Sequence, residues 1–304
     1  MKIINSLLIR NFNTIDSLTL SFGDFDGLHL GHQYILQKLI SFKDTKNALI
    51  NFLPNSKAFF QQKEEFFLTS LDQKIAFYRF LGLNYLFLWR WSQKLALLTK
   101  NDFINVLKQN HVKRIVITKE ARFGYQRKGN YQDLSEIFEV CVIEDYAKNN
   151  NCQHKISSTY IKKLLIQGKI EEANFCLGKP YLIQGKVIEG QQKGRLLGFR
   201  TANLDYTNFF LPHPGVYAVF VIYESKKYAG TANLGVRPTF EKETKKLLEI
   251  HILNFDKVLY NQIIEVEFIS FLRKEKKFTH ISELIAQIQK DVAVTKDLLN
   301  KKTF

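Results

Sequence analysis

Cysteine is scarce in this sequence, and the few cysteines are not arranged to form cross-links or a metal site. Cys141, Cys152 and Cys176 are the three cysteines of the chain, and no two of them make a Cys-x-x-Cys pair. An odd number of scattered thiols argues against a disulfide framework, and the lack of a close pair argues against a zinc site. We therefore expect reduced thiols and a cytoplasmic protein.

Long hydrophobic runs are missing as well. No stretch reaches the roughly 18 uninterrupted apolar residues that a membrane-spanning helix requires. Near the start of the chain, Asn5, Ser6 and Arg10 interrupt the apolar run that a signal peptide would need. We expect no signal peptide, and no membrane among the partners of the protein.

Acidic residues are outnumbered by basic ones, which gives a net charge of +15. Residues 1–180 carry 25 Lys and Arg against 16 Asp and Glu, and residues 181–304 carry 19 against 13. Because the excess is spread over the chain, it favours a generally basic surface over a dedicated nucleic-acid-binding arm. Such a surface suits acidic or phosphorylated ligands. Lysine, asparagine, isoleucine and phenylalanine are plentiful and proline is rare, so AT-rich coding is a second explanation of the charge.

The length of 304 residues fits two domains, and the first half alternates strand and helix patterns. Ser70 with Gln73 forms a capping box for a helix ending near Gly82, and residues 102–109 show a second helical pattern. Short apolar runs, typical of strands buried on both faces of a parallel sheet, occupy residues 18–22, 48–53, 85–89, 114–117 and 140–143. This alternation predicts an open, Rossmann-like α/β domain with ligands at the carboxyl ends of its strands.

The second half has a different pattern. A helix over residues 169–177 is closed by Gly178 and ended by Pro180, so we place the domain boundary there, with domains at 1–180 and 181–304. Turn residues then separate strands at 187–188, 216–222, 247–253 and 263–269. Regularly spaced strands of this kind predict an antiparallel barrel. A helical stripe that packs on it follows at Ile281, Leu284, Ile285, Ile288 and Val292.

The stretch from Gly23 to His32, GDFDGLHLGH, joins the strand at 18–22 to a helical pattern. Backbone N–H groups at a helix start suit phosphate, and Gly27 and Gly31 let a ligand approach the backbone closely. His29 and His32 add two donors on the same side. The alternative is a glycine turn with two solvated histidines, but the strand and the FDG sequence before it favour a binding site.

This stretch resembles the HxGH signature of the nucleotidyltransferase superfamily, in the form carried by bacterial FMN adenylyltransferases. Ile156–Lys163 (ISSTYIKK) resembles the ISSTxxR motif of that family, although its serines also suit a plain helix cap. The sequence RFG at 122–124, followed by basic residues, resembles the loop that contacts nucleotide and flavin. The resemblance implies that His29 and His32 are catalytic. It implies ligand contacts at Gly23, Phe25, Gly27, Gly31, Arg122, Ser157, Ser158, Thr159 and Lys162.

Residues 181–304 resemble the riboflavin kinase family at residues 185–203 (GKVIEGQQKGRLLGFRTAN), 215–219 (GVYAV), 230–240 (GTANLGVRPTF), 248–255 (LEIHILNF) and 271–278 (FLRKEKKF). The resemblance implies that Glu249 is the general base for the riboflavin 5′-hydroxyl, where alternation alone also allows a surface carboxylate. It implies a Mg²⁺ ion at Thr201 and Asn203. Contacts with ATP or flavin are implied for Gly190, Lys193, Gly194, Arg195, Asn203 and Arg273.

Together the two resemblances imply a bifunctional enzyme. It phosphorylates riboflavin to FMN with ATP and Mg²⁺, then adenylylates FMN to FAD with release of pyrophosphate, and it belongs to the α/β nucleotidyltransferase and β-barrel kinase fold classes. The sequence departs from the family pattern at Leu53, Glu120, Ala121 and Lys162, and Arg200 stands where the family has proline.

The first four departures motivate an alternative, a riboflavin kinase with a non-catalytic first domain. An RNA-binding protein is a second alternative that rests on charge alone. Since no RRM-like aromatic motif is present, we expect riboflavin, FMN, FAD and ATP as ligands and no nucleic acid. The sequence leaves the oligomeric state open.

Overall fold

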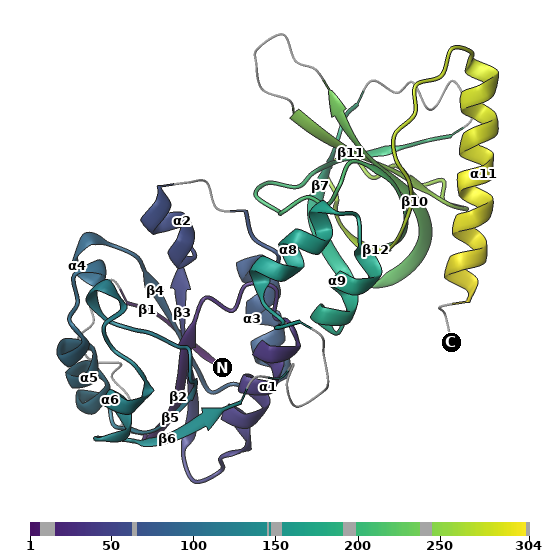
Figure 1. Cartoon of the computed structure of the whole chain (residues 1–304). Helices are drawn as coiled ribbons and strands as arrows, with labels where there is room; N and C mark the ends of the chain where they lie inside the picture. The colour runs from purple at the N-terminus through teal and green to yellow at the C-terminus, as the bar shows by residue number, and fades with distance from the viewer. Residues whose placement is uncertain are drawn as a thin grey trace. The chain divides into compact units, whose positions relative to one another are not determined.

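The chain folds into two compact units, residues 1–158 and residues 159–304 (Figure 1). The structure, a computed structural model, describes residues 1–6, 16–62, 66–144, 146, 154–190, 199–237 and 245–301. It describes the backbone alone for Ser6, Val236, Arg237, Lys245 and Lys246. Within these ranges, no helix is long and apolar enough to cross a membrane. The domain boundary at Pro180 stays a prediction.

A sheet of six parallel strands forms the centre of the first unit. In chain order they are β1 (Lys2–Ser6), β2 (Leu18–Gly23), β3 (Lys46–Leu53), β4 (Tyr85–Arg90), β5 (Val112–Thr118) and β6 (Glu139–Ile143). They lie in the order β1-β4-β3-β2-β5-β6, and each neighbouring pair is parallel. The predicted α/β fold is confirmed, and each of the five apolar runs forms a strand. The edge strand β1 is one that the sequence patterns do not predict.

Helices cover both faces of this sheet (Figure 1). They are α1 (Leu30–Ser41), α2 (Ser56–Gln61), α3 (Leu71–Phe80), α4 (Gln93–Ala96), α5 (Lys100–Gln109) and α6 (Tyr131–Ser135). On one face, Leu36 of α1 and Tyr78 of α3 share a buried cluster with Leu49 of the sheet. On the other face, Phe103 of α5 packs with Ile50. Both faces are therefore buried, which explains why the strand sequences are continuously apolar.

The first turn of α3 is the capping box that the sequence predicts. The Ser70 hydroxyl accepts a hydrogen bond from the Gln73 backbone N–H at 3.3 Å, and the Gln73 side chain accepts one from the Ser70 N–H at 2.9 Å. Two of the unpaired N–H groups at the helix start are satisfied in this way. The cap fixes where α3 begins, and this helix contacts the segment that follows β2 through Lys74 and Tyr78.

A closed barrel of six antiparallel strands forms the second unit. The strands are β7 (Tyr181–Ile188), β8 (Ala202–Asp205), β9 (Gly215–Tyr223), β10 (Lys226–Arg237), β11 (Lys245–Ile252) and β12 (Ile263–Arg273). They follow each other around the barrel in the order β10-β11-β8-β7-β12-β9. The predicted antiparallel barrel is confirmed, and β8 and β10 are additional strands that the sequence patterns miss.

The C-terminal helix α11 (Ile281–Asn300) packs on the outside of the barrel (Figure 1). Its buried residues are Asp291, Thr295 and Leu299, and Leu299 meets Ala218 of β9. The helix is therefore where the sequence predicts it, and the predicted apolar stripe lies on its buried side. Leu284, Ile285, Ile288 and Val292 are half-buried on the face that continues to Thr295 and Leu299, whereas Ile281 at the helix start is 66% exposed. The polar residues are buried because each has a partner in the barrel wall, as the Thr295 hydroxyl, 3.2 Å from that of Thr231, illustrates.

Two helices precede the barrel strands, α8 (Ser158–Ile166) and α9 (Ile170–Leu177). The second unit includes α9 and all of α8 except its first residue, Ser158, which belongs to the first unit. The Asn174 side chain of α9 donates to the Phe268 carbonyl of β12 at 2.8 Å and accepts from the Tyr181 N–H of β7 at 2.7 Å. Gly178 closes α9 in the left-handed conformation, with φ of 69°, as its sequence predicts. Helix α9 is thus hydrogen-bonded to the barrel.

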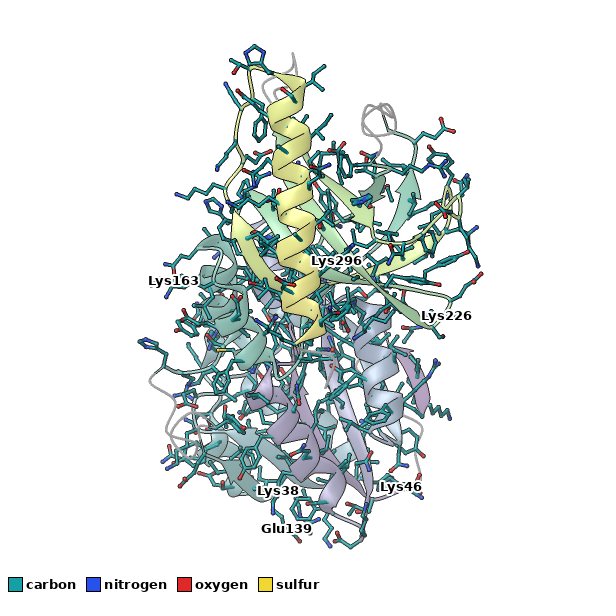
Figure 2. All side chains as sticks on the ribbon, turned by 90° about the vertical axis from the view of Figure 1, so that its right-hand side faces the viewer. Lys38, Lys46, Glu139, Lys163, Lys226 and Lys296 are labelled. Atoms are coloured by element: carbon teal, nitrogen blue, oxygen red, sulfur yellow. The ribbon has the colours of Figure 1, made fainter. Side chains whose placement is uncertain are left out.

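The basic charge is distributed over many elements. Figure 2 labels Lys38, Lys46, Lys163, Lys226 and Lys296, which project from α1, β3, α8, β10 and α11 and are all exposed. These five lysines come from five different elements, so no single element carries the positive charge among them. This distribution agrees with a generally basic surface rather than with one basic arm.

Candidate active sites

The first candidate site lies at the carboxyl end of β2, in the middle of the parallel sheet. The chain passes from β2 to β3 on one side, whereas β5 lies on the other side of β2. Such a reversal of strand order opens a crevice outside the carboxyl ends of the strands, which is where open α/β sheets bind ligands. Residues 23–32 follow β2 at this point, so the sequence motif and the topology indicate the same place.

The two histidines stand together at the start of α1. His29 is the N-cap residue, and its Nδ1 accepts a hydrogen bond from the His32 backbone N–H at 3.3 Å. The rings of His29 and His32 are stacked, with centroids 3.6 Å apart. Because Nδ1 of neutral His29 accepts this bond, its proton is on Nε2, which makes Nε2 a donor. The helix start and both imidazoles therefore lie together, an arrangement that is chemically able to bind an anion.

Glycine is required within this turn. Gly27 has φ of 89°, a conformation that side-chain-bearing residues rarely adopt. A Cβ atom on Gly31 would lie 3.3 Å from the His29 ring, so Gly31 lets the histidine pack against the helix backbone. The predicted residues Gly23, Gly27, Gly31, His29 and His32 are thus all parts of one compact turn, together with the buried Phe25.

His32 is electrostatically unusual. Burial first, and then the neighbouring charges of His29 and Lys74, hold the pKa of His32 well below its ordinary value of 6.5. Its Nδ1 is buried and has no hydrogen-bond partner among the described residues. The imidazole of His32 is consequently neutral at pH 7. A buried polar atom without a protein partner is costly in a folded protein, so it calls for a specific explanation, of which a catalytic role is one.

Segments far from the turn in sequence hold it in place. The Asp24 carboxylate accepts from the Ser56 N–H at 3.1 Å and from the Ser56 hydroxyl, and burial raises the pKa of Asp24. Asp26 Oδ1 accepts from the backbone N–H groups of Leu68 and Thr69 at 2.7 and 3.3 Å. The carboxylates of Asp24 and Asp26 therefore hold the turn in its conformation.

Ser158, the last residue of the first unit, is hydrogen-bonded to the histidine turn. The Ser158 hydroxyl donates to the Asp26 carbonyl at 2.7 Å, although 132 residues separate them in sequence. Ser157 is partly exposed beside it, and the next residue, Thr159, is exposed on α8. Lys162 belongs to the second unit, where its Nζ lies 5.4 Å from the Phe210 ring centroid. The structure thus brings Ser158 and residues 23–32 together, whereas the ligand contacts of Thr159 and Lys162 stay predictions.

An aromatic pocket of about 650 Å³ lies beside the turn. Its walls come from the carboxyl ends of β2 and β3, the segment after β4, helices α2, α4 and α5, and the loop after β5. Ser56 lines it while also binding Asp24. The Trp91 ring stacks on Phe52, with centroids 5.1 Å apart. Arg122 lines the pocket, and its Nη1 donates to the carbonyls of Lys119 and Ala121. Its ligand contact stays a prediction. The pocket suits a flat apolar ring system with a charged group at one end.

The second candidate site lies on the outer face of the barrel. Leu248 and Ile250 are fully buried, so Glu249 between them points to the opposite side of β11. In the strand register Glu249 lies between Asn203 of β8 and Asn233 of β10. Directly opposed residues of antiparallel strands have neighbouring side chains. The structure therefore brings together Glu249 and Asn203, which the sequence predicts, and adds Asn233.

Asn203 has the properties of a ligand-binding residue. It is 6% exposed, and its Oδ1 has no hydrogen-bond partner among the described residues. A Cβ atom added to Gly190 would lie 1.9 Å from Asn203 Nδ2, so glycine alone lets this segment approach the amide. Thr201, two residues earlier on the same side of the chain, is exposed. An unsatisfied amide oxygen with a hydroxyl beside it fits a Mg²⁺–phosphate group, because Mg²⁺ prefers oxygen ligands and keeps waters and phosphates as the rest.

The described residues hold no group of three or more His, Cys, Asp or Glu that could bind a metal. A cavity of about 160 Å³ adjoins Thr201 and Arg200, with Ile252, Phe255 and Leu259 among its walls. Arg200, which replaces the proline of the family pattern, accepts a hydrogen bond at its carbonyl from His251 Nδ1 at 2.8 Å. This contact ties the segment that presents Thr201 to β11.

Three of the predicted contacts, Lys193, Gly194 and Arg195, lie outside the described residues. Arg273 is described, and its guanidinium binds the buried Asp291 carboxylate through Nε and Nη2 at 2.7 to 3.0 Å. The structure thus shows Arg273 linking β12 to α11, and its ligand contact stays a prediction.

Sequence reasoning missed three features of these sites. They are the buried Lys74 below the histidine turn, Asn233 beside Glu249, and the aromatic walls of the pocket. Only the pocket left a local signal, the repeated aromatic residues at the ends of β3 and β4. The other two depend on contacts between distant segments, which no local pattern reports.

Known proteins are similar to this chain over nearly its whole length. The riboflavin kinase family matches residues 177–299, and the FAD synthetase family matches residues 13–160. A protein of Buchnera aphidicola subsp. Schizaphis graminum is 35% identical over 99% of both chains. One from Escherichia coli K12 is 31% identical over 96% of both. Both relatives are named bifunctional riboflavin kinase/FMN adenylyltransferase. The crystal structure of a macrolide-efflux protein from Streptococcus pneumoniae superposes with a TM-score of 0.86 at 26% identity, covering 97% of this chain and 98% of that chain.

Proposed function

The chain belongs to the family of bifunctional riboflavin kinase/FMN adenylyltransferases, and from that premise we propose which of its residues carry out the two reactions. The enzyme transfers phosphate from ATP to riboflavin, giving FMN and ADP. It then joins FMN to the adenylyl group of a second ATP, giving FAD and pyrophosphate. The observation that carries the assignment of residues is that each unit has, at the predicted position, a buried polar atom with no partner in the part of the chain that the structure describes: His32 Nδ1 in one and Asn203 Oδ1 in the other.

In adenylyl transfer, an oxygen of the FMN phosphate attacks the α-phosphorus of ATP, and the bond to the pyrophosphate oxygen breaks. The substrate is itself the nucleophile, so the protein has to place two phosphates and stabilise the charge that develops between them. The start of α1 offers backbone N–H groups for this, and His29 Nε2 offers a donor. His32 would contribute a neutral imidazole. Ser157, Ser158, Thr159 and Lys162 would hold the triphosphate.

The aromatic pocket of the first unit would bind the isoalloxazine ring of FMN. Its volume of about 650 Å³ lies within the usual range of ligand pockets. Phe52 and Trp91 provide flat apolar surfaces, on which an aromatic ring system stacks favourably. Ser56, which lines the pocket and binds Asp24, connects it to the histidine turn, where the FMN phosphate would lie.

In the kinase reaction, Glu249 would accept the proton of the riboflavin 5′-hydroxyl as its oxygen attacks the γ-phosphorus of ATP. Thr201 and Asn203 would hold Mg²⁺, which when bound neutralises charge on the phosphates. Gly190 would let the nucleotide-binding segment lie against Asn203, and the cavity beside Thr201 would receive an apolar part of ATP. Lys193, Gly194, Arg195 and Arg273 would add phosphate or flavin contacts.

A single incubation tests both assignments. The purified chain is supplied with riboflavin, ATP and Mg²⁺, and its flavins are separated by chromatography over time. We expect FMN to appear first and FAD to follow. Glu249→Gln should lower FMN formation by about a hundredfold or more and spare adenylylation of added FMN. His32→Ala should have the opposite effect, lowering FAD formation by about a hundredfold while FMN still forms. If either variant retains wild-type rates in both steps, that residue is not part of its site.

We also place the enzyme in the cytoplasm, where ATP is supplied and where Cys141 and Cys176 would remain thiols. The domain boundary at Pro180 belongs to the same proposal. The alternative of a non-catalytic first domain is disfavoured, because the first unit keeps an intact histidine turn beside a flavin-sized pocket.

A further inference from the structure

Lys74 is the only fully buried lysine or arginine of the part of the chain that the structure describes, with 4% of its surface exposed. It lies in the first turn of α3, four residues after the N-cap Ser70. Burying an ammonium group is unfavourable unless nearby polar groups compensate for the lost water. A buried lysine that persists in a core therefore calls for an explanation beyond packing.

The contacts of Lys74 lead to the histidine turn. Its Nζ donates a hydrogen bond to the Asp24 backbone carbonyl at 2.8 Å, across 50 residues of sequence. One helical turn later, Tyr78 packs against Phe25, with ring centroids 6.5 Å apart, and Phe25 in turn packs against His32 at 5.0 Å. Helix α3 therefore supports the turn at two successive positions, one charged and one aromatic.

The charge of Lys74 also acts at the site. It favours the ionised form of Asp24 and disfavours the protonated form of His32. Among the residues that the structure describes, Asp26 and His29 of the same turn also act electrostatically on Asp24 and His32, and the hydroxyl of Tyr78 on α3 is a further ionisable group nearby. A fixed cation close to the place where two anionic phosphates must meet lowers the cost of bringing them together, and it does so strongly where water is excluded.

We propose that Lys74 is a positioning residue for adenylyl transfer, which fixes the backbone of the histidine turn through Asp24 and supplies a permanent positive charge beneath it. Lys74 need not touch either substrate in this role. It acts through the position of His32 and through the electrostatic potential of the site. The inference rests on the adenylyltransferase function proposed above for the first unit.

The test uses the full-length enzyme and three variants. Lys74→Met removes the charge and the hydrogen bond while keeping the length of the side chain, and Lys74→Arg keeps the charge. His32→Asn identifies the NMR signal of His32. We expect Lys74→Met to lower kcat for FAD formation by about 10- to 100-fold, since small displacements of a reacting group cost that much, with less effect on the KM for FMN. Lys74→Arg should recover part of the loss, and riboflavin phosphorylation should stay unchanged in both.

Two further readouts separate positioning from a purely structural role. Both tryptophans of the chain, Trp89 and Trp91, lie in the first unit, so their fluorescence reports how much of that unit is folded. The His32 imidazole should titrate at a higher pH in Lys74→Met than in the wild type or Lys74→Arg. Wild-type kcat in Lys74→Met would overturn the proposal. A loss of activity no larger than the unfolded fraction, with an unmoved His32 titration, would overturn it too. If the wild type made no FAD at all, the proposed function would fail, and the His32 titration would still decide whether Lys74 acts on that histidine.

Discussion

Replacing Gly190 with alanine is the most direct test of the kinase site, because the structure leaves no room for the added methyl group. A Cβ atom at this position would lie 1.9 Å from Asn203 Nδ2, 2.6 Å from its Cγ and 2.9 Å from its Oδ1. Asn203 is 6% exposed, and its neighbours across the strands are Ile188 and Glu249. The amide therefore cannot turn away without disturbing the row of side chains to which it belongs.

The size of the effect follows from the overlap. Non-bonded carbon atoms approach to about 3.5 Å at best, so the amide or the Gly190 backbone must move by more than about 1 Å. Misplacing a positioning group by about 1 Å costs on the order of a hundredfold in rate, equivalent to about 2.7 kcal/mol in the activation free energy. We expect Gly190→Ala to lower kcat/KM for FMN formation by about that factor.

The assay follows FMN from riboflavin and ATP, with FAD formation from added FMN as the internal control. Gly230→Ala is the matched substitution in the same barrel, because its Cβ would meet its nearest atom, the His251 carbonyl oxygen, at 3.1 Å. If Gly190→Ala acts by displacing Asn203, it should add little in the Asn203→Ala background, where the clash is gone. A Gly190→Ala enzyme with wild-type kcat/KM, or effects that add fully in the double variant, would refute the reasoning.

Three further predictions concern His32, Lys162 and the domain boundary. As the pH falls below 6.5, His32 is protonated in the unfolded chain but not in the folded chain. The free energy of unfolding, measured with urea, should therefore fall faster in the wild type than in His32→Asn, by up to about 1.4 kcal/mol per pH unit. Parallel plots of unfolding free energy against pH for the two proteins would contradict this. Lys162→Arg should keep or raise FAD formation, because a guanidinium binds phosphate bidentately, and a large loss of kcat would count against a phosphate contact. A fragment of residues 159–304 should make FMN. It should also unfold at a higher urea concentration than a fragment of residues 181–304, which lacks the Asn174 bonds to the barrel. Equal midpoints of urea unfolding would show that α9 is dispensable.

The fold class could be predicted from the sequence because the strands of the first unit are short and continuously apolar. The strands that were missed have weaker signals. In β10, the buried residues Ala232 and Leu234 alternate with Thr231 and Asn233 among glycines, so the pattern has little hydrophobicity. The edge strand β1 pairs with β4, and its sequence KIINS mixes polar and apolar residues. Both β1 and β10 are stabilised by pairing with neighbouring strands. The sequence of a single segment does not show with which strands it will pair.

The site was predictable only where its residues are close together in sequence. The turn from Gly23 to His32 carries its own strand, glycines and helix start, and the structure confirms that it joins β2 to α1. Lys74 is 50 residues away from its partner Asp24, and nothing in its helix distinguishes it from a surface lysine. The side of β11 on which Glu249 lies depends on which neighbours are buried, so alternation alone left it open.

The positions at which this chain departs from the family pattern can now be compared with the contacts that hold the histidine turn. Glu120 is on the surface, 61% exposed at its side chain, and pairs with Lys155 at 3.4 Å. Ala121 packs against one core cluster of the first unit, and Leu53 packs against the other. These three positions therefore contribute to the surface or to the general packing of the unit.

The bonds that fix the turn come from elsewhere. They are donated to Asp24 by Ser56 and Lys74, and to Asp26 by Leu68, Thr69 and Ser158. Ser56, Leu68 and Thr69 lie between β3 and α3, and they donate through backbone or hydroxyl groups. Since none of the five donors is Leu53, Glu120 or Ala121, substituting these three residues removes none of these bonds. A merely structural domain has no need of a buried lysine, two stacked histidines at a helix start and a glycine turn in one place. Their combination, with the His32 Nδ1 lacking a protein partner among the described residues, is what an adenylyltransferase site requires.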